Sequence, residues 1–294
     1  RGRAHGIQCQ SAPQRFHGIK TMTENVFERG ELRKWVMMAA LCLLYVFLYS
    51  PIAYVVYASF SVDIVWPFPP DFTLQAYLNV FDNSLYRDAF LNSLKIGIGS
   101  GILSTTIATA AVIGLLRYPT RMRTALFIVF LSPLFVAELL IGISSLAFNA
   151  RVLGLSGNIM SAVAANAVEG VAFSFLIILS QLVRYDWQMD DAAMVFGARP
   201  LRCFWEVTLP TIWPSIFGAF LISFILAFNN LEISFYNLGA IPTLPSVAWG
   251  SLRFGLGPEL FAIAAMTNAL VFAVFAAMYV LMRTGIVKFG YRGT

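Results

Sequence analysis

The sequence has 294 residues, of which 59% are hydrophobic and 12% are charged, and its net charge is +5. Soluble domains carry about 25% charged residues, so the composition excludes an ordinary soluble protein and indicates a chain whose solvent is the lipid bilayer. The sequence has no basic run interleaved with aromatic residues in a folded segment, which argues against nucleic acid as a partner.

Six apolar runs follow one another along the chain. A helix that crosses the hydrocarbon core needs about 20 predominantly apolar residues, and each run reaches that length with at most one acidic residue inside it. We predict an all-α membrane protein whose six transmembrane helices lie near residues 35–60, 92–116, 124–148, 160–183, 212–236 and 260–283.

The polar, basic start of the chain lacks the apolar core of a signal peptide. We predict that residues 1–34 form a cytoplasmic segment, disordered over 1–21, and these first 21 residues read either as part of the protein or as sequence encoded upstream of Met22. The membrane domain then covers 35–283, and a tail follows at 284–294.

Sixteen of the twenty Lys and Arg residues lie before the first span, after the sixth, or in the loops that follow the second and fourth spans. Because Lys and Arg are retained on the cytoplasmic side of a membrane, we predict that both termini and the loop 184–212 are cytoplasmic. The membrane itself is then the first partner of the chain, and the positive charge serves mainly to orient it.

Between the spans, the mixed polar and aromatic segment 61–91 predicts an extracytoplasmic loop with a short amphipathic helix near 73–81 on the membrane surface. Pro51 and Pro133 are expected to kink their spans. The stretch 237–259 holds three prolines and several glycines, so we expect an irregular connection rather than a plain helix. Irregular backbone cannot face lipid, and this connection should be partly buried in protein.

The second span carries small residues at four-residue spacing, Gly97, Gly101 and Thr105, continued by Thr109. Such a stripe lets another helix approach closely. We predict packing within this subunit or against a second one.

Three acidic residues fall within or near the predicted spans, namely Glu138, Glu169 and Glu232. A charge near the bilayer centre costs at least about 2.5 kcal/mol, so such acids usually face a cavity or a partner. The i+3 and i+4 spacing places Asn229, Asn230 and Glu232 on one broad helix face with Ser234. Structural alternatives remain: Glu232 reaching outside water, Glu138 hydrogen-bonded within the protein, and Glu169 paired with Asn166.

Catalytic motifs are missing from the sequence. It has no Gly-Lys pair, which excludes a phosphate-binding P-loop, and both histidines lie within residues 1–21, which leaves no His-based triad or metal site in the membrane. We therefore expect no enzymatic activity and no bound cofactor in this chain. The three cysteines imply no disulfide.

The loop after the fourth span contains a patterned stretch, DAAMVFGARPLRCFWEVTLP at 191–210. Glycine suits a helix end and proline a first turn, so we predict a helix at 189–197, a break at Gly197, a second helix from near Pro200 and a stop at Pro210. A plain amphipathic surface hairpin is the simpler interpretation.

The stretch resembles the Glu-Ala-Ala loop of binding-protein-dependent ABC importer permeases, in which an acid, two alanines, a glycine and a terminal Leu-Pro recur at this spacing. The residues in register are Asp191, Ala192, Ala193, Gly197, Val207, Leu209 and Pro210. Asp191 stands for the usual Glu and Val207 for the usual Ile. The resemblance runs from about Val36 to Met282.

Within that superfamily the chain looks closest to the polyamine-type branch, on the stretches 92–118, 131–146 and 223–239. It departs from that branch where Asn229 and Asn230 replace common acids and where Ala172 replaces a proline. These departures leave the solute open.

The resemblance implies a type I ABC importer permease fold with a cytoplasmic coupling-helix loop, in a bacterial inner membrane. It implies a periplasmic binding protein that delivers solute, a second and non-identical permease subunit, and an ATPase homodimer that binds ATP and Mg. The hairpin would then be the lever that the ATPases move. Spans three to five would line the path, with Glu138, Asn229, Asn230 and Glu232 as candidate solute contacts.

Two other classes of protein fit the composition. A stand-alone secondary transporter or channel typically shows an internal repeat, which we do not find in the sequence, and it would give the hairpin no role. A membrane-embedded enzyme would need a catalytic constellation.

Overall fold

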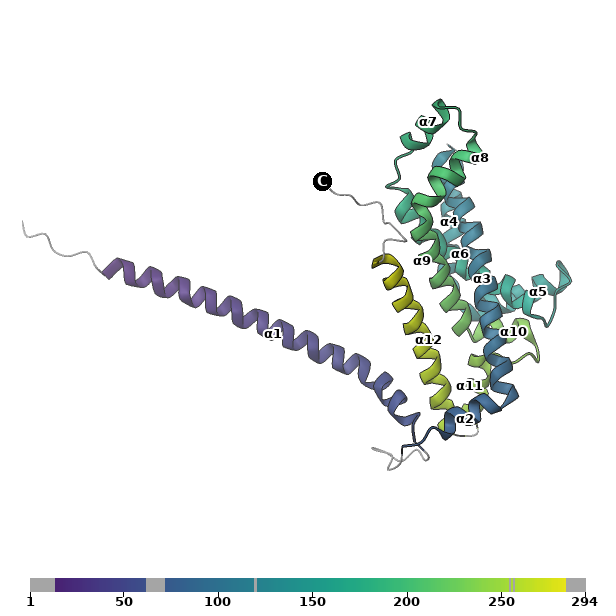
Figure 1. Cartoon of the computed structure of the whole chain (residues 1–294), viewed down its shortest axis with the longest axis horizontal. Coiled ribbons are helices and arrows are strands. Elements are labelled where there is room, and N and C mark those ends of the chain that lie inside the picture. The colour runs from purple at the N-terminus through teal and green to yellow at the C-terminus, as the bar shows by residue number, and fades with distance from the viewer. Residues whose placement is uncertain (1–13, 62–71, 119–120, 254, 256, 284–294) are drawn as a thin grey trace, which may run out of the picture. The chain divides into compact units, whose positions relative to one another are not determined.

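The computed structural model describes residues 14–61, 72–118, 121–253, 255 and 257–283, with side chains omitted for 14–33, 281 and 282. These residues are mostly helical, and one isolated antiparallel bridge joins Ser61 to Phe72. In chain order the helices are α1 Gln14–Ala58, α2 Gln75–Asp82, α3 Ser84–Arg117, α4 Arg123–Leu131, η1 Ser132–Phe135, α5 Glu138–Arg151, α6 Ile159–Leu182, α7 Gln188–Val195, α8 Pro200–Cys203, η2 Phe204–Thr208, α9 Leu209–Asn229, α10 Glu232–Leu238, α11 Leu244–Leu252 and α12 Pro258–Arg283 (Figure 1).

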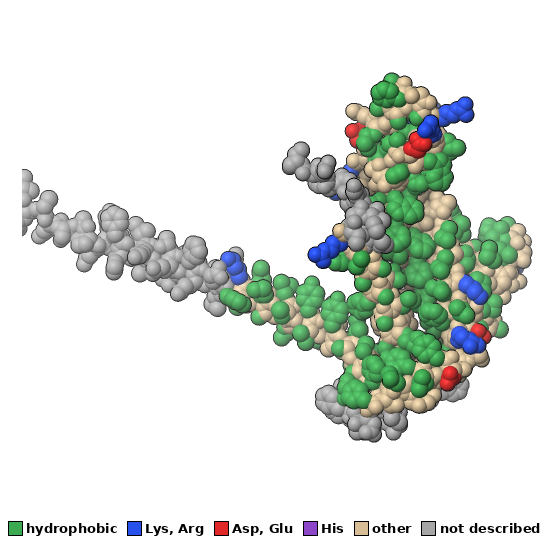
Figure 2. Space-filling model, in the orientation of Figure 1, with side chains coloured by type: hydrophobic (Ala, Val, Ile, Leu, Met, Phe, Trp, Pro, Cys, Tyr) green, Lys and Arg blue, Asp and Glu red, His purple; other side chains and the backbone are tan. Residues whose placement is uncertain are grey.

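Among the described residues, five helices are long and apolar enough to cross a membrane, and the bent pair α4 and α5 makes a sixth span if it is counted as one. Apolar side chains cover the sides of the long helices (Figure 2). The predicted all-α, six-span membrane fold is therefore confirmed. The short helix predicted near residues 73–81 is also confirmed, as α2.

The chain divides into two compact units, one up to Val55 and the other from Val56 onward. Most of α1 forms the first unit, with Pro51 inside the helix. This helix begins at Gln14, within the predicted leader, while residues 1–13 and the predicted tail 284–294 lie outside the described residues. All sites discussed below belong to the second unit.

The core of the second unit is the packing of α3, α6 and α9 against one another. Small residues allow the close approach: a Cβ atom on Gly97 would lie 2.9 Å from the ring of Phe224, and one on Gly101 would lie 2.9 Å from the ring of Phe220. The Thr105 hydroxyl donates to the Gly101 carbonyl of its own helix at 2.7 Å. The small-residue face of α3 thus lies against α9 within this subunit.

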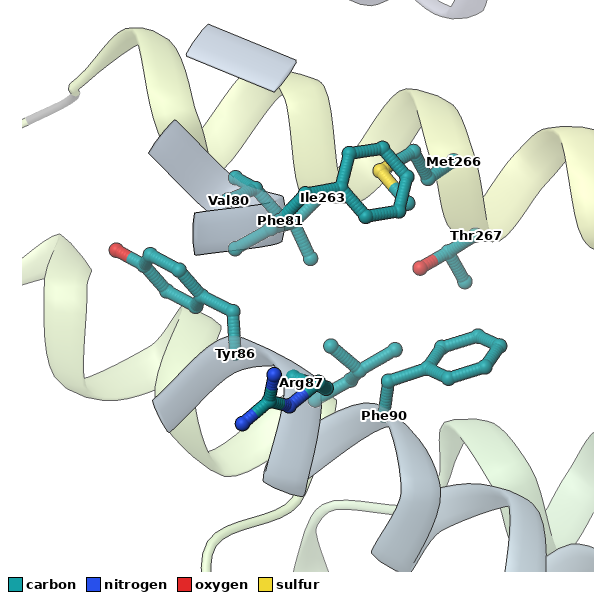
Figure 3. Close-up of a pocket in the computed structure, with 9 residues that line it drawn as sticks. Val80, Phe81, Tyr86, Arg87, Phe90, Ile263, Met266 and Thr267 are labelled. Atoms are coloured by element: carbon teal, nitrogen blue, oxygen red, sulfur yellow. The ribbon is translucent and has the colours of Figure 1, made fainter. Parts of the chain in front are cut away.

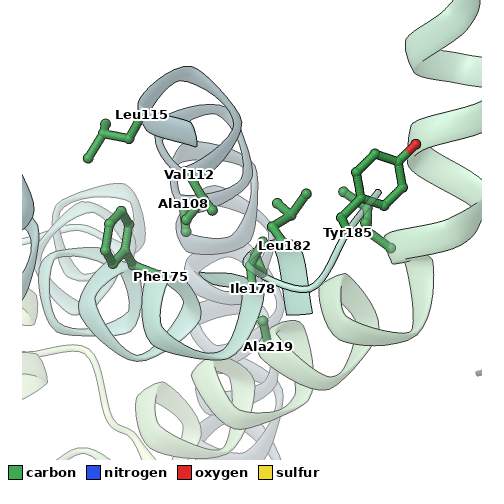
Figure 4. Close-up of a cluster of buried hydrophobic side chains, with 9 residues drawn as sticks. Ala108, Val112, Leu115, Phe175, Ile178, Leu182, Tyr185 and Ala219 are labelled. Atoms are coloured by element: carbon green, nitrogen blue, oxygen red, sulfur yellow. The ribbon is translucent and has the colours of Figure 1, made fainter. Parts of the chain in front are cut away.

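Buried apolar side chains continue this packing toward the end of the unit that carries α7 and α8. They form one cluster that joins α3, α6 and α9 (Figure 4), with these members: Ala108, Val112, Leu115, Phe175, Ile178, Leu182, Tyr185, Ile212 and Ala219. Tyr185 is the member that lies beyond the end of α6, and its hydroxyl points away from the other labelled side chains.

The third span is broken, which corrects the continuous helix predicted at 124–148. The 3-10 segment η1 contains Pro133, and Val136 and Ala137 have extended backbone, so that the helical segments before and after them meet at 110°. A proline ring clashes with the carbonyl four residues earlier and removes one helical hydrogen bond. The kink expected at Pro133 is therefore a full break, and Glu138 opens the new helix α5.

The fifth span is broken as well, which corrects the helix predicted at 212–236. The helix α9 ends at Asn229, Asn230 is extended, and α10 starts at Glu232. The stretch 237–259 is also more regular than expected. It contains the nine-residue helix α11, before whose first turn the backbone N–H of Thr243 donates to the Ser246 hydroxyl at 2.9 Å.

Candidate functional site

The two broken spans meet at a hydrogen bond between Glu138 and Asn230. The Asn230 side-chain amide donates to Oε2 of Glu138 at 2.7 Å, and its Oδ1 accepts the backbone N–H of Ile233 at 2.8 Å. Asn230 thus caps α10 and holds the acid that opens α5. Glu138 lies in the first turn of α5, where the positive end of the helix dipole favours a carboxylate.

A second acid joins this pair from α6. Glu169 is half-buried and lies within electrostatic range of Glu138. Its predicted alternative partner, Asn166, instead donates to its own helix at Ala162 and to the hydroxyl of Ser234 at 3.1 Å. Two spans thus lose their helical backbone at the contact between Glu138 and Asn230, and a second carboxylate on α6 lies within electrostatic range of it.

The polar face predicted for the fifth span does not form as one face, because the helix breaks at Asn230. Asn229 is exposed and donates to the Ile225 carbonyl of its own helix. Glu232 is exposed in the first turn of α10, while Ser234 is buried. The candidate residues are thereby separated into the buried Asn230, which contacts the exposed Glu138, and the exposed Asn229 and Glu232 on either side of the break.

A buried amide network, which no sequence pattern indicated, holds α10 in position. Asn237 is fully buried and donates to the carbonyls of Gly142 and Ile233. Its Oδ1 accepts from Asn149 at 3.1 Å and from Ser161 at 3.0 Å. This network ties α10 to α5 and α6, and so gives Glu138 and Asn230 a rigid frame.

A cavity of about 600 Å³ lies in the angle between η1 and α5, against α6. Its polar lining comes from Ser132, Ser144, Ser145 and Asn149. Two other lining residues, Val136 and Val168, lie within two positions of Glu138 and Glu169. The size is within the range of small-molecule sites.

A smaller cavity of about 140 Å³ lies between α2, α3, α11 and α12 (Figure 3). Its walls are largely apolar side chains, and the charged group among them is the cation Arg87. An apolar wall offers no replacement for the water around a charged solute, and Arg87 repels cations. This cavity is therefore unsuited to a cationic ligand.

The patterned loop folds as a helical hairpin, α7 and α8. Gly197 separates the two helices with φ of +92°, a backbone conformation that glycine adopts readily and other residues do not. Pro200 starts α8, as predicted. Pro210 does not stop the helix: the π-helical turn η2 precedes it, and α9 continues to Asn229. A π turn shifts the backbone pairing by one residue, which accommodates the proline.

The motif residues occupy two regions of the hairpin. Asp191, Ala192 and Gly197 are exposed, with Ala193 half-buried beside them, whereas Val207 and Leu209 are half-buried at the junction with α9, where Pro210 is exposed. Next to Gly197, the side chains of Val195 and Phe196 are 85% and 92% exposed. Asp190, one position before the motif, is fully buried, and no sequence pattern distinguishes it from Asp191.

Known proteins resemble this chain in sequence and in fold, although no family model matches the chain. The chain is 28% identical over 252 residues to the putrescine transport system permease protein PotI of Escherichia coli (strain K12), covering 83% of this chain and 89% of that protein. It is 27% identical to the spermidine/putrescine transport system permease protein PotC of Haemophilus influenzae, covering 82% and 94%.

A crystal structure of a bacterial ABC transporter that imports the acidic polysaccharide alginate superposes with a TM-score of 0.67 at 19% identity, over 93% of this chain and 99% of that one. The fold is thus that of an ABC transporter permease. Together with the curated relatives, it supports a membrane permease subunit of an ABC importer, close to the polyamine-type branch. In such importers the permease subunits are not themselves catalytic.

Proposed function

We propose that this permease passes a small polyamine-like cation across the bacterial inner membrane, from a periplasmic binding protein to the cytoplasm. The observation that carries the proposal is the gathering of Glu138, Glu169 and Asn230 at two breaks in the spans. The names of the relatives PotI and PotC support a polyamine over other cations.

The chemistry of the cluster suits an ammonium group. Two carboxylates in a membrane repel one another, and a cation between them replaces that repulsion with attraction of about 4 kcal/mol per charge pair at 4 Å and an effective dielectric constant of 20. The Asn230 amide already donates to Glu138, which leaves the carboxylates with acceptor capacity for the ammonium protons. Glu232 and Asn229, exposed on either side of the break, would guide the solute.

The proposed partners are matched here to surfaces of the hairpin and the helices. Asp191, Ala192 and the exposed Phe196 at the hairpin tip would dock with an ABC ATPase homodimer, which binds the ATP and Mg that drive transport. Leu209 and Pro210 would join the hairpin to α9. The close packing of α3 on α9 at Gly97 and Gly101 would make these two helices move together. A second, non-identical permease subunit would complete the path. Both termini would be cytoplasmic.

The test is to tag the chain, purify it in nanodiscs from its native host and identify the associated subunits by mass spectrometry. We expect an ATPase, a second permease, and ATP hydrolysis that rises when putrescine and the cognate binding protein are added. Recovery of the chain alone, with putrescine transport that needs no ATP, would instead support a secondary transporter.

Replacement of Gly197 by Ala is expected to lower uptake while leaving membrane insertion normal. A Cβ atom at Gly197 meets no neighbour, so the change adds only backbone strain at φ of +92°, of roughly 1–2 kcal/mol. Strain in the lever should reduce uptake of labelled putrescine by about fivefold, a typical size for coupling between sites.

The matched control is Gly154→Ala, because Gly154 has φ of +65° and equally open space but lies in the loop between α5 and α6. We expect uptake at the wild-type rate for this control. Equal uptake by the two variants, per amount of inserted chain, would argue against the lever.

A further inference from the structure

A single buried carboxylate joins the hairpin to two membrane helices. Asp190 lies on α7 with no exposed surface. Its Oδ2 accepts from Nη1 of Arg117 at 2.8 Å, its Oδ1 accepts from the Tyr185 hydroxyl at 2.7 Å, and the Thr208 hydroxyl lies 3.1 and 3.2 Å from the two oxygens. Arg117 ends α3, and Thr208 immediately precedes α9.

Arg117 also contacts the rest of the hairpin. Its guanidinium lies 5.6 Å from the centre of the Trp187 ring, and its Nη2 donates to the sulfur of Met194 at 3.8 Å. Trp187 precedes α7 and Met194 lies in its last turn. The end of α3 is therefore held at the start, the first turn and the last turn of the same short helix.

Tyr185 links the same carboxylate to the apolar core, by a hydrogen bond at its hydroxyl and by packing of its ring. Its ring belongs to the buried cluster that contains Leu182 and Ile212 (Figure 4). Burial, and then the hydrogen bond to Asp190, raise the pKa of the Tyr185 hydroxyl, so the group stays protonated and donates. Three donors from three segments thus converge on one carboxylate.

The neighbouring acids have different surroundings. Asp191 is exposed, as expected of a residue that contacts a partner protein, whereas Asp190 is buried. We propose that Asp190 is a positioning residue that makes α3 and α9 move together with α7 when the ATPases move the hairpin. This inference rests on the proposed role of the hairpin as the lever.

The route continues to the solute site through contacts already described. The helix α9 starts one residue after Thr208 and ends one residue before Asn230, which donates to Glu138. The helix α3 packs closely on α9 at Gly97 and Gly101. A buried ion pair that loses one partner leaves an uncompensated charge, so the native network resists separate movement of α3 and α7.

The experiment uses the full importer in proteoliposomes and measures labelled putrescine taken up per ATP hydrolysed. For Asp190→Asn we expect the ATPases to remain bound and basal hydrolysis to persist, while uptake per ATP falls about tenfold, within the range for coupling between sites. Tyr185→Phe removes one hydrogen bond and keeps the ion pair, so we expect a smaller fall in the same ratio. The double variant Asp190→Asn with Arg117→Gln should recover part of the loss, because no charge is left unpaired.

The control is Glu206→Gln, which breaks an exposed ion pair of equal length on the same hairpin, Arg202 to Glu206 at 2.8 Å. Its uptake per ATP should match the wild type, since exposed pairs contribute little. Wild-type ratios in Asp190→Asn and Tyr185→Phe would overturn the inference. So would a loss of folded complex and uptake in equal proportion, with the ratio unchanged, since that marks a purely structural role. An unaltered importer without ATP-dependent uptake would overturn the proposed function itself, and this inference with it.

Discussion

Replacement of Glu138 by Gln is expected to lower uptake of a polyamine by about tenfold or more, since one lost charge beside a cation forfeits roughly 1–4 kcal/mol between the dielectric limits of water and protein. Gln has nearly the same shape and keeps a carbonyl oxygen that accepts the Asn230 amide, which donates at 2.7 Å in the native protein. The break between α9 and α10 should therefore persist, and the loss should appear in transport rather than in folding.

The measurement is the initial rate of labelled putrescine uptake in proteoliposomes, corrected for the amount of assembled importer. Glu259→Gln is the matched control, because Glu259 also accepts from an asparagine amide, that of Asn79 at 3.1 Å, but this contact joins the first turn of α12 to α2. Glu169→Gln should resemble Glu138→Gln, since the two acids act on the same cation. Wild-type uptake in both the Glu138 and Glu169 variants would make these acids structural and remove the main support for a cationic solute.

The membrane fold was predictable from sequence because hydropathy acts on whole helices. Each span of about 20 apolar residues must satisfy its backbone internally, and this requirement fixes where the helices lie. The breaks were not predictable in the same way. Pro133 signalled a kink, but only tertiary packing decides that it becomes a 110° turn, and the break at Asn230 has no proline inside it.

The candidate site was predicted as a set of residues but not as an arrangement. Glu138 and Asn230 were each singled out because polar groups are costly in a membrane. Their contact joins positions 92 residues apart, which no local pattern encodes. Asp190 was missed for a related reason. It is adjacent to Asp191 and identical in type, so only its burial distinguishes it. That burial depends on contacts with Arg117 and Tyr185 from other segments.

The small residues where α3, α6 and α9 meet determine how closely these helices approach. The Ser223 hydroxyl donates to the Gly170 carbonyl at 3.0 Å and lies 2.7 Å from the Ser174 hydroxyl. Ser104 of α3 lies opposite Gly170. A Cβ atom added at Gly170 would collide with the Ser104 hydroxyl and would lie 3.3 Å from the Ser223 hydroxyl. All three helices would have to separate to admit a larger side chain at this position.

Gly170→Val is accordingly expected to abolish most of the folded permease. Overpacking a tight core typically costs about 1–3 kcal/mol, and occasionally more; here the rigid backbones of three helices leave little room to adjust. The measurement is the monodisperse fraction of the chain after extraction in mild detergent, together with its thermal midpoint. Gly218→Val is the control, because Gly218 lies on α9 of the same core and a Cβ atom there has no neighbour within 4 Å. Equal recovery of the two variants would show that the helices can separate at Gly170. Loss confined to Gly170→Val would show that the spacing of α3, α6 and α9, and with it the frame around Glu138 and Asn230, depends on this one glycine.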